Sequence, residues 1–433
     1  MSILFENVTA VLMDSAHTVL PGAFVAVEGR TITSVGTVRP NGEFARVING
    51  RGGILMPGLI NCHTHTPMTA MRGYGDGHNL QDWLNDFIFP VEAKWDDRAI
   101  RACADLGLME MIASGTTCIA DMYMRMNIMG QAVADAGISA NLCCGGVFFG
   151  DTFSPEACDD CAVQEDLLRT WHGHDQGRIR VDAALHAEYT STPGLWEWTA
   201  DFAKRNNLGM HVHISETKRE HEECKARWNG LTPIQTLDKY GVWDVRSISA
   251  HCVWTTPEDW SLMAKKGITA VHNPASNLKL GSGVAKVPSM RKLGVNVALG
   301  TDGVSSNNST DLFEDMKLAA LLQNGVLCDP LAMDAWAALE LATVCGAKAL
   351  GRDTGAIAVG KDADLILLDP DAPNLIPCHD AANNIAYAAH GANVKLNMCR
   401  GKVIYENGDF LTIDADKVRR EVTEYALPLL FGK

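Results

Sequence analysis

The sequence predicts an α/β fold: a (β/α)8 barrel of the TIM type with a small, discontinuous β-sandwich domain built from both chain ends. Apolar strand-like runs alternate eight times with longer segments of helical period, which is the number of repeats in a TIM barrel. Short β-branched segments occupy both ends of the chain. We therefore expect residues 56–354 to form the barrel, and residues 1–55 and 355–433 to form the composite β-domain with a C-terminal helix.

The first 55 residues predict short strands and no helix. Brief β-branched or alternating segments are separated by turn residues such as Pro21-Gly22 and Gly29-Arg30. The predicted strands are residues 9–13, 23–28, 31–35 and 46–49. They account for only half of a small β-domain.

From residue 54 onward, strand-like and helical segments alternate, which is typical of βα units and a parallel sheet. The predicted strands are residues 54–62, 116–121, 138–145, 179–186, 209–214, 247–252, 268–272 and 295–300. The predicted helices are residues 98–114, 193–206, 216–240, 257–265, 284–291 and 310–324.

After a further helical region at residues 329–350, the short-strand pattern returns. Residues 363–368, 394–399 and 402–406 predict strands, with glycines at the intervening turns, and residues 414–427 predict a closing helix. We pair this region with the first 55 residues because each has too few strands for a domain of its own.

The composition excludes some classes of partner. The 433-residue chain is 47% hydrophobic and carries a formal net charge of -15, which repels nucleic-acid phosphates and anionic membrane surfaces. No apolar run approaches the ~18 residues of a membrane span, and the N-terminus lacks a signal-peptide pattern. We expect a cytoplasmic protein that acts on a small molecule and forms a homo-oligomer, as enzymes of this size commonly do.

The 13 cysteines are odd in number, and several lie inside apolar runs, which favours reduced, buried thiols over a disulfide framework. Cys158 and Cys161 form a C-x-x-C motif. No second pair follows at zinc-site spacing, so we assign this motif no role.

Metal-ligand side chains gather at the ends of the predicted strands. The first strand ends in His63 and His65, whose i, i+2 spacing puts both imidazoles on one side of a strand. The other strand ends carry His186, His213 with Glu216, His251, His272 and Asp302. Active sites of TIM barrels lie at these C-terminal ends. Three imidazoles and one carboxylate, with a position left for water, predict a catalytic divalent metal site.

His211 and His272 receive a different interpretation. Each lies in or at the end of a predicted strand, but a single histidine there is more often a packed, hydrogen-bonded imidazole than a ligand. His211 shares a side with His213 and lies two residues deeper in the barrel.

Four segments resemble the amidohydrolase superfamily: Pro57-Gly-Leu-Ile-Asn-Cys-His-Thr-His65, His213-Ile-Ser-Glu216, Ser249-Ala-His251 and Gly300-Thr-Asp302. Within it, the chain is most similar to the 5'-methylthioadenosine/S-adenosylhomocysteine deaminases and to their chlorohydrolase and guanine-deaminase relatives. Residues 272–283 and 359–364 support the resemblance, which spans nearly the whole chain.

The resemblance implies that one divalent metal, Zn²⁺ in the first place and Fe²⁺ or Mn²⁺ as alternatives, is held by His63, His65, His213 and Asp302. Binuclear relatives carry a carbamylated lysine at the end of the fourth strand, and residues 183–188 contain none. Glu216 would shuttle protons, and His251 would hydrogen-bond the attacking water and the developing oxyanion. Asp302 would also pass a proton to the leaving amine.

For the substrate, Glu92 resembles the residue that binds two ribose hydroxyls, and His186 resembles a substrate-contacting histidine. The implied function is metal-dependent hydrolytic deamination of adenosine-type nucleosides: 5'-methylthioadenosine, 5'-deoxyadenosine, adenosine or S-adenosylhomocysteine. Relatives that bind S-adenosylhomocysteine offer arginines in the loop before strand four. Here the corresponding residues 151–175 are rich in acids, and Glu165 and Asp166 flank Arg169 closely, which favours neutral 5'-substituents.

Two alternatives remain open. One is a deaminase or chlorohydrolase of another heterocycle, such as guanine, a pterin or a triazine, and Glu92 discriminates because a free base has no diol. The other is a binding protein that has kept the barrel without its catalysis.

Overall fold

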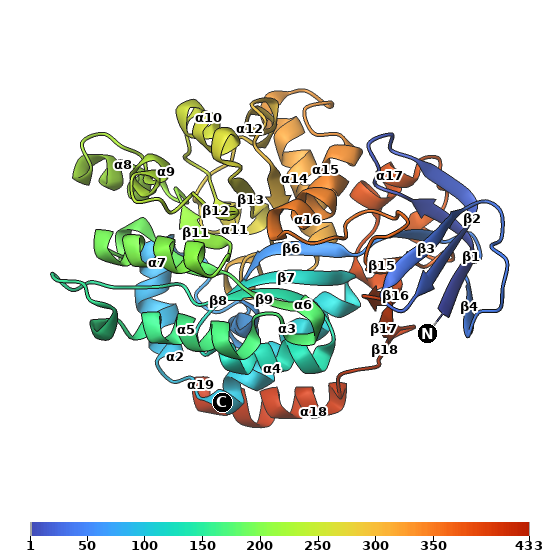
Figure 1. Cartoon of the computed structure of the whole chain (residues 1–433), viewed down its shortest axis with the longest axis horizontal. Helices are drawn as coiled ribbons and strands as arrows, with labels where there is room; N and C mark the ends of the chain where they lie inside the picture. The colour runs from blue at the N-terminus through green and yellow to red at the C-terminus, as the bar shows by residue number, and fades with distance from the viewer. Residues whose placement is uncertain (1, 433) are drawn as a thin grey trace.

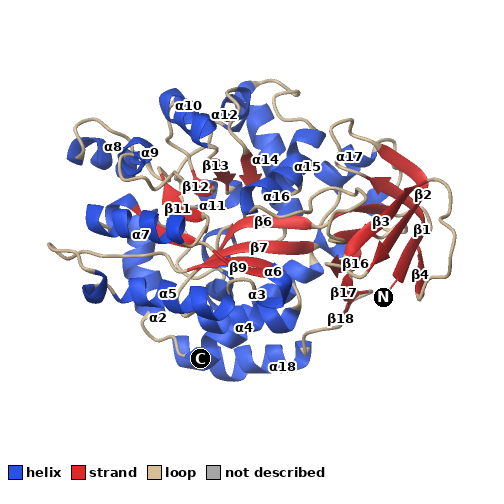
Figure 2. Ribbon diagram, in the orientation of Figure 1, coloured by secondary structure: helices blue, strands red, loops and turns tan. Residues whose placement is uncertain are grey.

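The computed structural model describes residues 2–432. Parallel strands surrounded by helices make up one part of the molecule, and a sheet that contains both chain-end regions lies beside it (Figure 1, Figure 2). The predicted α/β class is therefore confirmed. Among the described residues, none of the helices combines the length and apolarity needed to cross a lipid bilayer.

The parallel strands form two hydrogen-bonded sheets. The first has the order β6-β7-β8-β9 (Leu59–Thr64, Thr116–Met122, Ser139–Cys143, Ile179–Val181). The second has the order β10-β11-β12-β13-β14 (Ala183–Ala187, Met210–Ile214, Ser247–His251, Thr269–His272, Val297–Leu299). An isolated parallel bridge between Gly146 and Leu185 joins them on one side. On the other side, the Asp302 N–H donates to the His63 carbonyl at 2.9 Å.

The predicted strand at residues 179–186 is wrong as a single element, because it is divided at Asp182. This carboxylate is buried and accepts hydrogen bonds from Asn141 Nδ2 at 2.7 Å and from the Gly209 N–H at 2.9 Å. A buried charge needs such partners, and satisfying it interrupts the ladder between the two halves.

The predicted strand at residues 54–62 is likewise divided, at Gly58. β5 (Ile54–Pro57) pairs with strands of the chain-end sheet, whereas β6 begins the first parallel sheet. A Cβ on Gly58 would lie 2.2 Å from Thr117 Cγ2, so only glycine lets the chain pass from one sheet to the other here.

Helices cover the parallel sheets. The longer ones are α3 (Asp97–Ala113), α4 (Met126–Ala136), α5 (Asp159–Trp171), α7 (Pro193–Arg205), α8 (Lys218–Arg227), α10 (Pro257–Lys266), α14 (Leu312–Leu327), α15 (Ala335–Ala342) and α16 (Val344–Leu350). The shorter ones include α1 (Leu80–Trp83), α2 (Phe89–Glu92), α6 (His174–Gly177), α9 (Pro233–Asp238), α11 (Pro274–Lys279), α12 (Val287–Lys292), α13 (Val304–Asn307) and α17 (Ala381–Asn383).

Three helical segments differ from the prediction. The helix expected at residues 216–240 is two helices, α8 and α9, and α5 occupies most of the stretch interpreted as an acidic loop. Helix α4 was not predicted, because Gly130 in its middle weakens the helical signal. That glycine is needed for packing, since a Cβ there would lie 2.5 Å from the Trp171 ring.

Both chain ends contribute to one nine-stranded sheet of order β18-β17-β16-β15-β5-β1-β2-β3, with β4 paired to β1. Its strands are β1 (Ser2–Val11), β2 (Val19–Glu28), β3 (Thr31–Gly36), β4 (Arg46–Asn49), β5, β15 (Leu365–Leu368), β16 (Val394–Cys399), β17 (Lys402–Glu406) and β18 (Asp409–Phe410). Buried Phe5, Val25, Leu365 and Met398 belong to its core.

The C-terminal helical stretch runs through α18 (Ala415–Arg420), a π-helical segment (Glu421–Ala426) and α19 (Leu427–Phe431). It packs on α3 rather than on the chain-end sheet, as the ion pair between Arg98 Nε and Glu421 Oε2 at 2.7 Å and the shared cluster of Ile100 with Val422 show.

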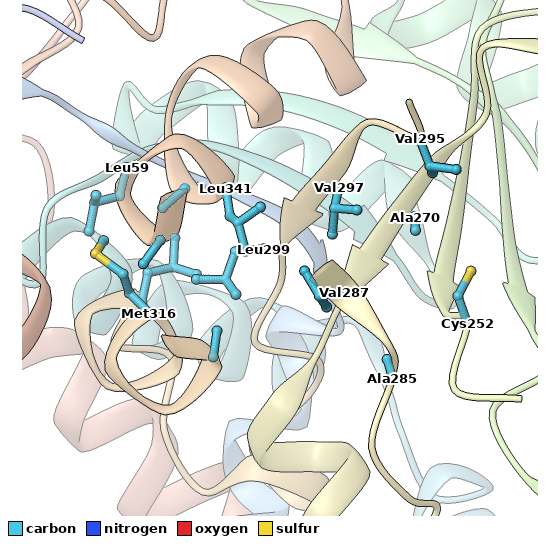
Figure 3. Close-up of a cluster of buried hydrophobic side chains, with 14 of the residues drawn as sticks. Leu59, Cys252, Ala270, Ala285, Val287, Val295, Val297, Leu299, Met316 and Leu341 are labelled. Atoms are coloured by element: carbon cyan, nitrogen blue, oxygen red, sulfur yellow. The ribbon is translucent and has the colours of Figure 1, made fainter. Parts of the chain in front are cut away.

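A large apolar cluster fixes the end of the second parallel sheet. Val297 and Leu299 of β14 lie close to Met316 of α14 and Leu341 of α15 (Figure 3). All four are at most 1% exposed, and burial of such side chains stabilises a fold by roughly 1.5–3 kcal/mol each. This packing fixes the point at which the chain leaves β14 and reaches Asp302.

Candidate active site

The predicted metal ligands converge. His63 Nε2 and His65 Nε2 lie 3.3 Å and 3.2 Å from Asp302 Oδ1. His213 Nε2 lies 3.4 Å from His65 Nε2. The ligand atoms of His63, His65 and His213 all lie within 4.8 Å of one another, and so do those of His63, His251 and Asp302. Residues from β6, β11, β12 and the end of β14 therefore share one site.

The three imidazoles predicted as ligands are oriented through their other ring nitrogen. His65 Nδ1 donates to the Met122 carbonyl, and His213 Nδ1 donates to the His186 carbonyl at 2.6 Å. His63 Nδ1 faces His211 Nε2 at 2.8 Å. Each Nε2 is thus directed into the site, which is the usual arrangement of metal-binding histidines.

The donor set fits a divalent cation. His63 Nε2 is buried and has no hydrogen-bond partner among the described residues, which is unusual for a buried polar atom and is explained if the nitrogen is a ligand. Three imidazole nitrogens and one carboxylate oxygen suit zinc, iron or manganese.

Asp302 is held as a carboxylate. Burial raises its pKa, but the adjacent His63 and His65 imidazoles outweigh burial and hold the pKa well below the usual range. Its oxygens also accept from Ser276 Oγ at 2.6 Å and from Ser306 Oγ at 2.9 Å.

The ligand histidines respond to the same forces. Burial lowers the pKa of His63 to about 4 and that of His213 well below its usual value, so both rings are neutral, as metal binding requires. For His65, burial also lowers the pKa, but Asp302 raises it further, to about 9. The Asp302 carboxylate therefore stabilises the protonated form of His65 when no cation balances its charge.

Glu216 and His251 form a second pair beside the ligands. Glu216 Oε2 lies 3.6 Å from His251 Nε2, and His251 Nδ1 donates to Asn277 Oδ1 at 2.9 Å. Burial, reinforced by Asp302, raises the pKa of Glu216. A carboxyl group with a raised pKa is suited to take up and release protons near neutral pH.

The two predicted substrate residues lie next to this group. Tyr123 at the end of β7 donates to Glu92 Oε1 at 2.7 Å, and the Tyr123 ring centroid is 6.2 Å from that of His65. The His186 ring centroid is 4.8 Å from that of His213. Both residues are therefore placed to contact a molecule bound at the ligands.

Several supporting residues were missed from sequence. The Glu220 carboxylate accepts the N–H groups of Ser215 and Glu216 at 2.6 Å and 2.7 Å. The capping-box pattern Thr217-x-x-Glu220 is a signal that sequence reasoning can find. Tyr123 carries no comparable local signal, because its partner is 31 residues away.

The interpretation of His211 as a packed, hydrogen-bonded imidazole agrees with the structure. His211 is 1% exposed, its ring nitrogens face His63 Nδ1 and Cys143 Sγ, and it belongs to neither group of possible metal ligands. For His272, the expected hydrogen bonds are wrong. His272 is 2% exposed, and neither of its ring nitrogens has a hydrogen-bond partner among the described residues.

Two other sequence features lie apart from these contacts. Arg169 is on α5, with its side chain 81% exposed and paired with Asp166. Cys158 and Cys161 are buried free thiols at the start of the same helix.

Comparison with known proteins agrees with this geometry. The model of the Amidohydrolase family matches residues 54–404. A 5-methylthioadenosine/S-adenosylhomocysteine deaminase of Acetivibrio thermocellus is 39% identical over 435 residues, covering 99% of this chain and 100% of that protein. A 5'-deoxyadenosine deaminase of Methanothermobacter thermautotrophicus is 40% identical over 408 residues, covering 94% and 95%.

Among solved structures, an adenosine deaminase from Xanthomonas campestris with bound zinc superposes with a TM-score of 0.93 at 31% identity, covering 99% of this chain and 98% of that chain. The family match and the similarity both extend over the strands that carry the site. The chain therefore belongs to the amidohydrolase family.

Proposed function

We propose that this protein is a metal-dependent hydrolytic deaminase that converts adenosine-type nucleosides to the inosine-type product and ammonia. The observation that carries the proposal is the convergence of three imidazoles and Asp302 on one point, with the Glu216–His251 pair beside it. The relatives named as deaminases of 5'-modified adenosines, and the zinc-containing adenosine deaminase, support it.

In this proposal His63, His65, His213 and Asp302 hold one divalent cation, with Zn²⁺ the first expectation and Fe²⁺ or Mn²⁺ the alternatives. The unpartnered Nε2 of His63 supports the assignment. Such a cation lowers the pKa of coordinated water from ~16 toward ~7 and so supplies a hydroxide nucleophile.

The residues around the ligands would carry the proton transfers. Glu216 takes the proton of the attacking water and delivers it to N1 of the adenine ring, as a general base and then a general acid. His251 is oriented by its Nδ1–H bond to Asn277 and would stabilise the negative charge on the oxygen that adds to C6 when its Nε2 also carries a proton, beside the Glu216 carboxylate. Asp302 would accept the remaining proton of the hydroxyl group added at C6 and pass it to the departing amino group, which leaves as ammonia.

The substrate assignment depends on Glu92. Burial raises the pKa of this carboxyl group, and the hydrogen bond from Tyr123 opposes that shift and orients Oε1. A carboxylate can accept two hydrogen bonds from the ribose 2'- and 3'-hydroxyls. His186 would contact the same molecule. Because Arg169 is exposed and paired with Asp166, we favour neutral 5'-substituents over S-adenosylhomocysteine.

The finer architecture is part of the proposal. We infer that the two parallel sheets form one closed eight-stranded barrel over residues 56–354, in which β9 and β10 are the two parts of one interrupted strand. Residues 1–55 and 355–433 would form a β-sandwich domain. The Asp302–His63 hydrogen bond and the Gly146–Leu185 bridge support closure. A cytoplasmic homo-oligomer remains our expectation.

An ammonia-release screen tests the function. The substrates are adenosine, 5'-methylthioadenosine, 5'-deoxyadenosine, S-adenosylhomocysteine, guanine and a pterin, with metal analysis of the same sample. We expect turnover of the neutral 5'-modified adenosines and about one equivalent of metal per chain. Turnover of guanine or the pterin alone would favour the alternative, and metal-free protein without turnover would favour a binding protein.

Glu92→Gln provides the second arm of the test. It should lower kcat/KM for nucleosides by about 10- to 100-fold, the value of one or two hydrogen bonds to a charged group, and change free-base turnover little. Asp86→Asn, an exposed acid in the same connection, is the matched control. Equal losses on nucleosides and bases would refute the ribose role.

A further inference from the structure

The His63 imidazole differs from the other two ligand imidazoles in what holds it. The Nδ1 atoms of His65 and His213 bind main-chain carbonyl oxygens, which only accept hydrogen bonds. His63 Nδ1 instead faces another imidazole, His211, at 2.8 Å, and the two rings meet at 71°. A ring nitrogen accepts a hydrogen bond only when it carries no proton, so this contact fixes His63 only if His211 has the right tautomer.

The structure contains a group that selects that tautomer. His211 Nδ1 lies 3.4 Å from the Sγ atom of Cys143, the last residue of β8. Cys143 Sγ lies 3.5 Å from the carbonyl oxygen of Asp121, to which its S–H donates. Because the thiol donates its proton to that carbonyl, the sulfur has only its lone pairs to offer to His211. It therefore accepts a hydrogen bond from His211 Nδ1–H.

The direction of every bond in the chain then follows. His211 carries its proton on Nδ1, so its Nε2 accepts from His63 Nδ1–H. His63 therefore has a free electron pair on Nε2, the atom that faces Asp302 Oδ1. The order is His63 Nδ1–H to His211 Nε2, His211 Nδ1–H to Cys143 Sγ, and Cys143 S–H to the Asp121 carbonyl.

Among the described residues, these buried atoms have hydrogen-bond partners only within this series of contacts. His63 is 0% exposed, and His211 and Cys143 are each 1% exposed, so bulk water does not compete for the bonds. Burial at a strand end does not by itself give a histidine hydrogen-bond partners in this protein. His272, 2% exposed at the end of β13, has no hydrogen-bond partner on either ring nitrogen among the described residues.

We propose that His211 and Cys143 are positioning residues that fix the tautomer and orientation of His63 and so set the affinity of the site for its metal. The inference rests on the proposed ligand set. It goes beyond that set because it assigns a role to a thiol and an imidazole that contact neither the metal nor the substrate.

The test measures Zn²⁺ dissociation constants by competition with a chromophoric chelator, together with the visible absorption of the Co²⁺-substituted protein. His211→Leu removes the acceptor of His63 and should weaken Zn²⁺ binding by about 10- to 100-fold, as loss of a supporting partner does. His211→Gln, whose carbonyl can accept from His63, should recover most of this affinity.

The cysteine variants test the outer link. Cys143→Ala should weaken Zn²⁺ binding by several-fold and alter the Co²⁺ spectrum, whereas Cys143→Ser, which keeps a donor and an acceptor, should resemble the wild type. Cys118→Ala is the matched control, because Cys118 is a thiol of similar burial, 0% exposed, in the neighbouring strand β7. Thermal unfolding of the metal-free proteins identifies any loss of fold.

The outcomes separate the two proposals. Wild-type Zn²⁺ affinity in both His211→Leu and Cys143→Ala overturns this inference, and so does an equal loss in Cys143→Ala and Cys118→Ala. Asp302→Ala tests the ligand set itself. If Asp302→Ala binds Zn²⁺ as the wild type does, the proposed metal site fails, whatever the His211 variants show.

Discussion

Glu220 should control both the stability of the site and the position of Glu216, the proposed proton shuttle. Its carboxylate accepts the N–H groups of Ser215 and Glu216 at 2.6 Å and 2.7 Å, and it is 3% exposed. Ser215 has a φ of 48°, a left-handed conformation that a serine rarely adopts. The two hydrogen bonds hold this strained turn, and the turn directs Glu216 toward His251.

The size of the effect follows from the number of donors left without a partner. A buried N–H that loses its acceptor costs roughly 1–3 kcal/mol. Glu220→Ala leaves two such groups and should lower the free energy of unfolding by about 2–6 kcal/mol. Glu220→Gln keeps one carbonyl oxygen and should cost about half as much.

Activity should change as well, because a proton shuttle contributes about 100- to 10,000-fold to the rate. Partial misplacement of Glu216 should lower kcat for ammonia release by at least about 10-fold in Glu220→Ala, with bound metal unchanged. Urea denaturation and steady-state kinetics on the metal-loaded protein measure both quantities.

Gln235→Ala is the control for this experiment. Gln235 holds the equivalent capping-box position in α9, where its Oε1 accepts the Thr232 N–H at 3.3 Å. It should lower stability by about 1 kcal/mol and leave kcat unchanged. Wild-type kcat in Glu220→Ala, despite reduced stability, would refute the positioning role.

Three further predictions concern the metal, a glycine and a buried acid. Removal of the metal with a chelator should abolish activity. Zn²⁺ at about 100 times its dissociation constant should restore activity and raise the free energy of unfolding by about 2.7 kcal/mol. Activity that survives complete chelation would contradict the metal site. Gly300→Ala should lower the free energy of unfolding by about 1–3 kcal/mol and weaken metal binding, because the new Cβ would lie 2.6 Å from the Asn273 amide and 2.9 Å from His63 Cβ. Gly325→Ala is the control, because a Cβ there has nothing within 4 Å and should cause neither loss. Thermal unfolding measures the change in stability. Burial raises the pKa of Asp315 from 3.8 to about 8, so between these values the native state binds more protons than the unfolded chain and this group's stabilising contribution falls as pH rises. The stability of Asp315→Asn relative to the wild type should therefore increase with pH by at most about 1.4 kcal/mol per unit, and a constant difference would contradict this.

The ligands were predictable because each is a polar residue at the point where an apolar strand ends. His63 lies at the end of β6, His65 follows that strand and Asp302 follows β14, so counting strands was enough to bring them to one end of the parallel sheets. The same counting could not locate Glu92, which lies in a long connection and was found only through the family resemblance.

The divisions at Gly58 and Asp182 were not predictable from periodicity. Each depends on a partner distant in sequence: Thr117 leaves no room for a side chain at Gly58, and Asn141 and Gly209 bind the Asp182 carboxylate. A hydrophobic pattern records burial, but it does not record which sheet a strand joins. The partners of His211 could not be named from sequence for the same reason, because they come from β6 and β8.

Backbone strain at the strand ends explains why the site needs so many supporting bonds. Ser215, His251 and Asp302 have φ values of 48°, 72° and 63°, and a left-handed residue other than glycine costs of the order of 1–3 kcal/mol. Glycine would relieve the strain, but at His251 and Asp302 it would remove the side chain that the chemistry requires. The strain must therefore be offset by neighbours, and each strained residue has one: Glu220 on the Ser215 N–H, Asn277 on the His251 ring, and the Gly303 N–H on Asp302 Oδ1 at 2.8 Å. Loss of a supporting bond should therefore move a functional side chain before it unfolds the protein.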